Sequence, residues 1–93
     1  MTERKSLHLV ISGQVQGVFF RVHTKEMADS LELVGWVKNL PDGEVEVYAK
    51  GGPKHLEKFL QWCHKGPPQA RVSDVEVVWD IDLGDFSSFE IVR

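Results

Sequence analysis

Apolar side chains near the start of the chain follow first a two-residue and then a helical repeat. Leu7, Leu9 and Ile11 alternate with polar residues, which predicts a half-buried strand that ends at Gly13. After a short loop, the residues that would share one helical face are Phe20, Thr24, Met27, Ala28 and Leu31. We therefore expect a strand, a loop and a helix, preceded by a loose polar tail at residues 1–5.

The middle of the chain predicts a hairpin and a second helix. Residues 34–40 and 45–49 are expected to be strands, and the turn tripeptide Pro41-Asp42-Gly43 separates them. Pro53 suits the first turn of a helix, which Gly66-Pro67-Pro68 would end. The apolar stripe of this helix consists of Leu56, Phe59, Leu60 and Cys63.

Two further extended segments, residues 72–81 and 86–92, complete the pattern. We interpret the order of elements as β-α-β-β-α-β, and two helices are too few to cover both faces of a sheet. The expected fold is an α+β, ferredoxin-like sandwich with both helices on one face of a four-stranded antiparallel sheet. A right-handed connection between neighbours would place the strand at residues 34–40 directly beside the first strand.

Length and charge exclude several classes of protein. The 93 residues suffice for one hydrophobic core, so residues 1–93 are expected to form a single domain with no separate cofactor domain. The single cysteine excludes an internal disulfide. Without a signal pattern or a membrane-spanning apolar run, we expect a cytoplasmic protein. The net charge of -3 gives no general attraction for nucleic acid, so an anionic ligand would have to be bound at a local site. We also expect the protein to be a monomer.

The loop between the first strand and the first helix has the features of an anion site. The N–H groups of a first helical turn lack intrahelical partners and lie at the positive end of the helix dipole. Gly17 would let the loop adopt positive φ and turn its amides inward. Arg21 follows closely, and a cation at a helix N-terminus is disfavoured unless a bound anion reverses the local field. Its planar guanidinium can hold two phosphoryl oxygens at once.

An alternative gives this loop no function. Arg21 would then be an ordinary surface arginine, and Val18, Phe19 and Phe20 would be core residues. Asn39 favours the functional interpretation, because asparagine is depleted in strands and the predicted strand order brings it near the loop. An asparagine within a strand is more often a bulge or turn residue, so Asn39 alone does not decide between the two.

Two longer segments resemble the signatures of one protein family. Residues 11–21, ISGQVQGVFFR, resemble the first acylphosphatase signature, and residues 35–45, GWVKNLPDGEV, continuing to Gly51, resemble the second. The resemblance implies an enzyme that hydrolyses acyl phosphates to a carboxylate and inorganic phosphate. It also implies direct attack of water at phosphorus, with no metal and no cofactor.

The same resemblance implies roles for individual residues. Arg21 corresponds to the phosphate-binding residue and Asn39 to the residue that orients the attacking water. Backbone amides would form a phosphate cradle, and the substrate-binding residues so implied are Gln16, Gly17, Val18, Phe19, Phe20 and Arg21. A carboxylate is a good leaving group, so positioning and charge stabilisation would suffice without a general acid.

Other chemistries find little support in the sequence. Val15 occupies the position, six residues before the arginine, where a phosphocysteine mechanism would need its thiol, and Cys63 falls on an apolar stripe. No zinc site is expected, because metal-ligand spacing is lacking around His8, His23, His55 and His64. Whether His23 or Thr24 assists the site stays open.

Two other classes of protein share parts of this pattern. RNA-binding modules use the predicted fold, but they need a basic surface and exposed sheet aromatics, and residues 45–47 and 75–77 offer no outward-facing aromatic pair. A regulatory protein could keep the anion loop without catalysis. The presence of both Arg21 and Asn39 argues against that class.

Overall fold

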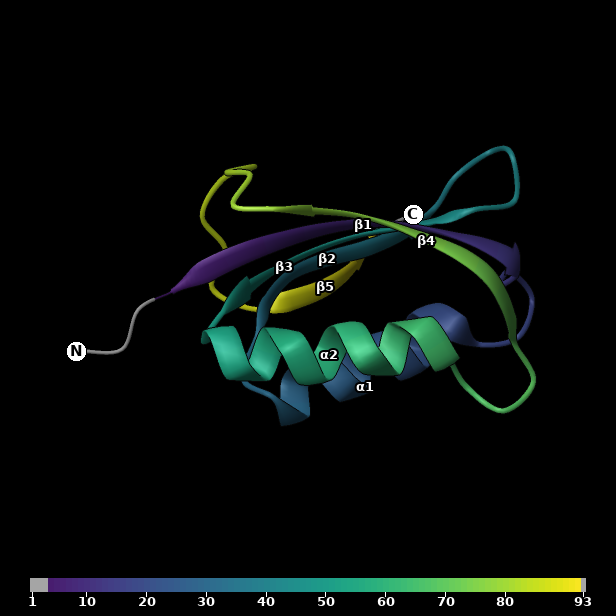
Figure 1. Cartoon of the computed structure of the whole chain (residues 1–93), viewed down its shortest axis with the longest axis horizontal. Helices are drawn as coiled ribbons and strands as arrows, with labels where there is room; N and C mark the ends of the chain where they lie inside the picture. The colour runs from purple at the N-terminus through teal and green to yellow at the C-terminus, as the bar shows by residue number, and fades with distance from the viewer. Residues whose placement is uncertain (1–3, 93) are drawn as a thin grey trace.

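The chain forms a layer of two helices packed against one face of a β-sheet (Figure 1). The structure is a computed structural model and describes residues 4–92. Its elements are β1 (Lys5–Gln14), α1 (Phe20–Ser30), β2 (Val34–Asn39), β3 (Val45–Gly51), α2 (Pro53–Lys65), β4 (Arg71–Trp79) and β5 (Phe89–Val92). The expected tail is shorter than predicted, because Lys5 already belongs to β1, and residues 1–3 lie outside the described residues.

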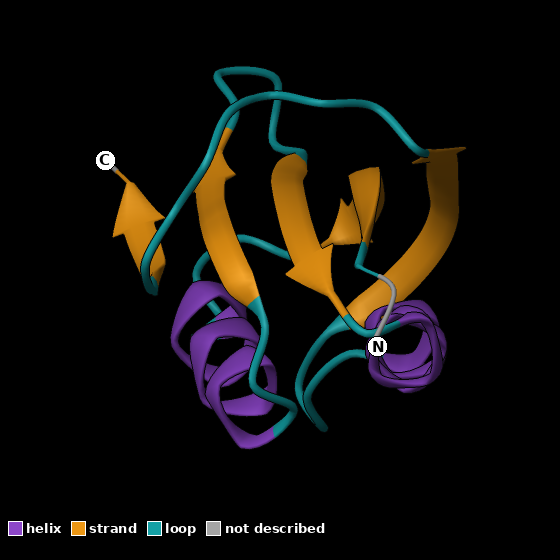
Figure 2. Ribbon diagram, turned by 90° about the vertical axis from the view of Figure 1, so that its left-hand side faces the viewer, coloured by secondary structure: helices purple, strands orange, loops and turns teal. Residues whose placement is uncertain are grey.

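The sheet contains five strands in the order β4-β1-β3-β2-β5, so the predicted four-stranded antiparallel sheet is wrong. Neighbouring strands are antiparallel except β2 and β5, which are parallel. Figure 2 shows the cause: the connection after β4 runs past the ends of the middle strands to the opposite edge. There Phe89 is fully buried, 6.1 Å from the Phe59 ring, so β5 extends the apolar face over the helices.

The predicted contact between the first two strands is also wrong, because β3 lies between β1 and β2. Val45 of β3 pairs with Ile11 on one side and with Asn39 on the other. The β1-α1-β2 crossover skips one position, which the returning arm of the β2–β3 hairpin fills. β1 and β2 are both antiparallel to β3, so they run in the same direction. Their last residues therefore lie at the same end of the sheet. Asn39 and the loop after Gln14 therefore still meet.

The core lies between the helices and the near face of the sheet. Its buried members include most of the residues predicted from the apolar pattern: Leu7, Leu9, Ile11, Phe20, Ala28, Val45, Val47, Leu56, Phe59 and Cys63. Met27, Leu31 and Leu60 are partly buried against it. Both helices thus cover one face, as predicted. No helix within residues 4–92 is long and apolar enough to span a bilayer.

The far face of the sheet carries an aromatic cluster that the sequence analysis did not anticipate. Tyr48 of β3 lies between Trp36, at 6.2 Å between ring centroids, and Phe86, at 5.7 Å. Phe86 belongs to the connection between β4 and β5, and it helps to cover Tyr48 completely. Within residues 4–92 the Tyr48 hydroxyl has no hydrogen-bond partner.

Candidate active site

A cavity of about 230 Å³ lies where β1 ends, α1 begins and β2 ends. It is lined by Val15, Gln16, Gly17, Phe19, Phe20, Arg21, Val22 and Asn39. Two segments that are distant in the sequence, the β1–α1 loop and the end of β2, therefore share one small hollow. The fold thus brings Arg21 and Asn39 to one cavity, along with most of the loop residues predicted from the sequence.

The backbone of the loop leaves the regular strand and helix regions twice. Gly17 has φ of 75°, the positive value expected for it. Phe19 adopts the left-handed conformation, with φ 59° and ψ 26°, and this was not predicted. A non-glycine residue pays about 1–2 kcal/mol there, and the Phe19 side chain is 70% exposed, so burial does little to offset that cost. Strain of this kind is typical of ligand-binding loops.

The N-terminus of α1 lies at the cavity, and no acidic side chain of its first turn neutralises the positive end of the helix dipole. Phe19 stands at the N-cap position with no side-chain cap, and the first turn contains no acidic residue. The orphan N–H groups and the positive end of the dipole are therefore not satisfied by a capping side chain. Phe20 is buried in the core, so its backbone N–H is the group it can offer to a ligand.

Arg21 is the second residue of α1 and lines the cavity. Among residues 4–92, no carboxylate lies within ion-pair distance of its guanidinium. A cation at this end of a helix adds to the positive field instead of balancing it. The combined field of Arg21 and the first-turn amides favours an anion in the cavity.

Asn39 is the last residue of β2, and its side chain is partly buried. Its Oδ1 atom is fully covered and has no hydrogen-bond partner within residues 4–92. Leaving such an acceptor unsatisfied costs roughly 1–3 kcal/mol, and buried polar groups without a partner are uncommon in native structures. The side-chain carbonyl of Asn39, a residue that lines the cavity, is therefore an acceptor that still lacks a donor within residues 4–92.

Comparisons with known proteins decide the family. A family model described as Acylphosphatase matches residues 7–91. The chain belongs to the acylphosphatase family. Its relatives include acylphosphatases from Acaryochloris marina, 52% identical over 94% of this chain and 92% of the relative, and from Pelotomaculum thermopropionicum, 46% identical over 95% and 96%.

Solved acylphosphatase structures agree with this family in fold as well. The acylphosphatase from Coxiella burnetii is 42% identical, with a TM-score of 0.91 over 96% of this chain and 93% of that one. The acylphosphatase from Bacillus subtilis is 36% identical, also with a TM-score of 0.91, over 96% and 99%. The α+β architecture with two helices on one face of the sheet is thus that of the family.

Three residues named from the sequence do not line the 230 Å³ cavity. Val18 does not line it and packs against the core, beside a neighbouring hollow that His23 also lines. The His23 ring is 3.3 Å from Glu26 on the same helix. The buried Thr24 hydroxyl donates to the Phe20 carbonyl at 2.7 Å. Thr24 is therefore engaged in holding the first turn of α1. Val15 and Val22, which do line the cavity, were not predicted to do so.

Cys63 is a residue of α2 and is completely buried, as expected for a core residue. Burial strongly raises the pKa of its thiol, because the thiolate would lose its hydration. A reactive thiolate is thereby disfavoured at this position. Within residues 4–92, no group of three or more His, Cys, Asp or Glu side chains is arranged to hold a metal ion.

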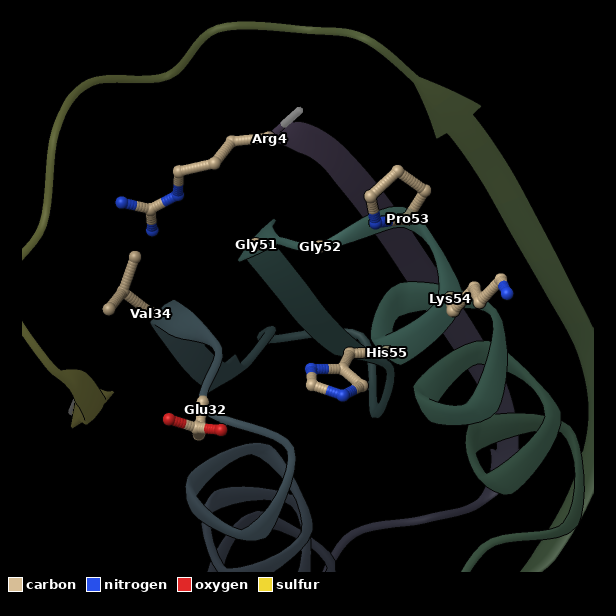
Figure 3. A pocket seen from close by; sticks show the side chains of 8 residues that line it. All are labelled: Arg4, Glu32, Val34, Gly51, Gly52, Pro53, Lys54 and His55. Carbon is tan, nitrogen blue, oxygen red and sulfur yellow. The ribbon is translucent and has the colours of Figure 1, made fainter. Parts of the chain in front are cut away.

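A second hollow, about 850 Å³, lies at the opposite end of the sheet, where β3 ends and β2 begins (Figure 3). Polar side chains from Arg4, Glu32, Lys54 and His55 stand on its rim. They do not converge on one point, since the Lys54 ammonium points away from the others (Figure 3). Binding sites combine a hollow with a few convergent polar groups, and the rim of this hollow does not provide them.

Proposed function

We propose that the chain hydrolyses acyl phosphates in the cavity between the β1–α1 loop and the end of β2, by direct attack of water at phosphorus and without a metal or cofactor. One observation carries this proposal. Arg21, residues of the β1–α1 loop and Asn39, whose side-chain carbonyl has no hydrogen-bond partner within residues 4–92, line a single small cavity. Family membership supplies the substrate class.

The positive groups of the cavity would hold the phosphoryl group. The Arg21 guanidinium would offer parallel donors to two phosphoryl oxygens, and amides of the loop residues that line the cavity, Gln16, Gly17, Phe19 and Phe20, would complete the cradle. Because the backbone amides are held by the fold before substrate arrives, they would stabilise the charge of the transition state with little reorganisation. Positioning and charge stabilisation are the main needs of phosphoryl transfer.

The Asn39 carbonyl would hold the attacking water. Its side-chain oxygen has no hydrogen-bond partner within residues 4–92 and could accept a hydrogen bond from water while the phosphoryl group sits on Arg21 and the amides. Water attacks phosphorus as the acyl oxygen leaves, and the products are a carboxylate and inorganic phosphate. Among the described residues that line the cavity, none carries a carboxylate, imidazole or thiol. The mechanism therefore relies on the leaving ability of the carboxylate itself.

The test is hydrolysis of benzoyl phosphate in the presence of excess chelator. We expect turnover that the chelator does not reduce, and far slower turnover of an aryl phosphate monoester, whose leaving group is poorer. A single turnover in heavy-oxygen water should place the label in phosphate. Label in benzoate would mean attack at carbon, and activity that returned only with added zinc or magnesium would show a missed metal requirement.

A further inference from the structure

The side chain of Gln16 joins the two halves of the proposed active site. Its Nε2 atom donates to the Leu40 carbonyl at 2.8 Å and to the Glu44 carbonyl at 2.8 Å. Gln16 belongs to the β1–α1 loop, whereas Leu40 and Glu44 flank the turn of the β2–β3 hairpin. One side-chain amide therefore ties the proposed phosphate cradle to the hairpin that carries Asn39.

The two acceptors are the carbonyls that also close the turn. The Glu44 carbonyl accepts from the Leu40 N–H at 2.8 Å, and the Leu40 carbonyl accepts from the Gly43 N–H at 3.2 Å. Both donor hydrogens of the Gln16 amide are thus committed to the hairpin. If the amide were flipped, its oxygen would face two carbonyl oxygens, so the orientation of the side chain is fixed by this contact.

Asn39 depends on its backbone for its position. Within residues 4–92 its Oδ1 atom has no hydrogen-bond partner that could orient it, and the residue that follows is Leu40, which Gln16 binds. Any movement of the turn relative to the loop would therefore move the Asn39 carbonyl relative to Arg21. A displacement of about 1 Å at a reacting group can cost as much as about 10²-fold in rate.

We infer that Gln16 is a positioning residue: its side-chain amide sets the place of the Asn39 carbonyl relative to the phosphate cradle. This role rests on the proposed function, and it is separate from any contact of the Gln16 backbone with phosphate. The side chain acts through Asn39 and does not touch the reacting atoms.

The test is a double-mutant cycle of Gln16→Leu and Asn39→Ala, with kcat for benzoyl phosphate as the readout. Leucine keeps the size of the side chain but removes both donors, and each carbonyl keeps its backbone donor, so the fold is expected to persist. We expect Gln16→Leu to lower kcat by about 10- to 100-fold in the parent. In the Asn39→Ala background it should lower kcat by less than about threefold, because the group it positions is gone.

Ser12→Ala is the matched control. The Ser12 hydroxyl also links β1 to the hairpin, through a 2.7 Å hydrogen bond to the Glu44 carboxylate, but Ser12 does not line the cavity. Loss of this link should leave kcat within about twofold of the parent, and the inhibition constant of inorganic phosphate should change little in either variant. If Gln16→Leu does not fold, Gln16→Asn, whose shorter amide cannot reach both carbonyls, replaces it in the cycle.

The outcomes separate this inference from the proposed function. A parent that does not hydrolyse benzoyl phosphate, or an Asn39→Ala variant with parental kcat, would overturn the proposed function. If both of those behave as proposed but Gln16→Leu costs the same in both backgrounds, Gln16 acts independently of Asn39 and the inference is wrong. Parental kcat in Gln16→Leu would also overturn it.

Discussion

Some residues of the cavity could be predicted from the sequence and others could not. Arg21 and Gly17 are conspicuous, because a cation at a helix N-terminus and a glycine inside a loop both need a reason. The left-handed Phe19 and the double contact of the Gln16 amide leave no such trace, since neither residue type is unusual in a loop. Both depend on tertiary contacts that no local pattern encodes.

The most specific prediction at this scale concerns Asn39. Asn39→Ala removes the proposed water acceptor but no donor to phosphate, so kcat should fall while the inhibition constant of inorganic phosphate stays nearly constant. One such hydrogen bond in the transition state is worth about 2.7–4 kcal/mol, or about 10²- to 10³-fold in kcat. If the only defect of the variant were weaker phosphate binding, Asn39 would bind the substrate and would not orient the water.

Arg21→Lys tests the planar guanidinium. Charge is kept, but a single ammonium cannot place two parallel donors on the phosphoryl oxygens. Loss of one charge-assisted hydrogen bond, about 1.5–3 kcal/mol, should lower kcat/KM by about 10- to 150-fold and weaken inhibition by inorganic phosphate. Arg71→Lys, at an exposed position on β4, is the control and should behave like the parent. Equal behaviour of the two variants would reduce Arg21 to a surface charge.

At the scale of elements, local patterns predicted the helices and the hairpin but not the long-range pairing of the strands. The hairpin at residues 34–51 and the apolar stripe of α2 follow from periodicity, proline and glycine within short windows. The place of β3 between β1 and β2, and that of β5 at the far edge, depend on partners many residues away. The segment around Phe89 alternates between apolar and polar residues like any half-buried strand. That alternation does not specify which edge of the sheet the strand joins.

The β1–α1 loop gives a prediction for an element. A Cβ at Gly17 would meet no atom within 4 Å, so the defect of Gly17→Val should come from its positive φ alone. We expect a loss of about 1–2 kcal/mol in the free energy of unfolding, weaker phosphate inhibition and lower kcat/KM. Calorimetry and inhibition kinetics would measure these effects.

Gly84→Val provides the matched control for the loop. Gly84 also has positive φ, 116°, and an added Cβ would make only ordinary contacts with Phe86. It lies in the connection between β4 and β5, remote from the cavity. A comparable loss of stability with unchanged phosphate inhibition is expected. If both variants weakened inhibition equally, the conformation of Gly17 would have no special bearing on phosphate.

At the scale of the whole molecule, the far face of the sheet differs from the binding face of an RNA-binding module. An RNA-binding sheet stacks bases on exposed rings, whereas Tyr48 is fully covered by its neighbours, and Glu46 on the same strand bonds His8 at 2.7 Å. Together with membership of the acylphosphatase family, this arrangement favours catalysis at the sheet end over recognition on the open face.

Tyr48→Phe should raise the stability of the molecule. The buried hydroxyl has no partner within residues 4–92, so its removal should add about 1 kcal/mol to the free energy of unfolding and raise Tm by about 4–8 °C. Tyr48→Leu, which also removes the ring contacts with Trp36 and Phe86, should be destabilised instead. A lower Tm for Tyr48→Phe would mean that the hydroxyl is satisfied in solution.

The enclosed Cys63 gives the molecule a built-in reporter of its own opening. It is the only thiol of the chain, and it lies between α2 and the sheet with no exposed surface. A thiol reagent can reach it only when α2 separates from the sheet or the chain unfolds, so the labelling rate measures how often that happens. Comparing that rate with and without inorganic phosphate would show whether a ligand at one end of the sheet restrains the helix layer as a whole.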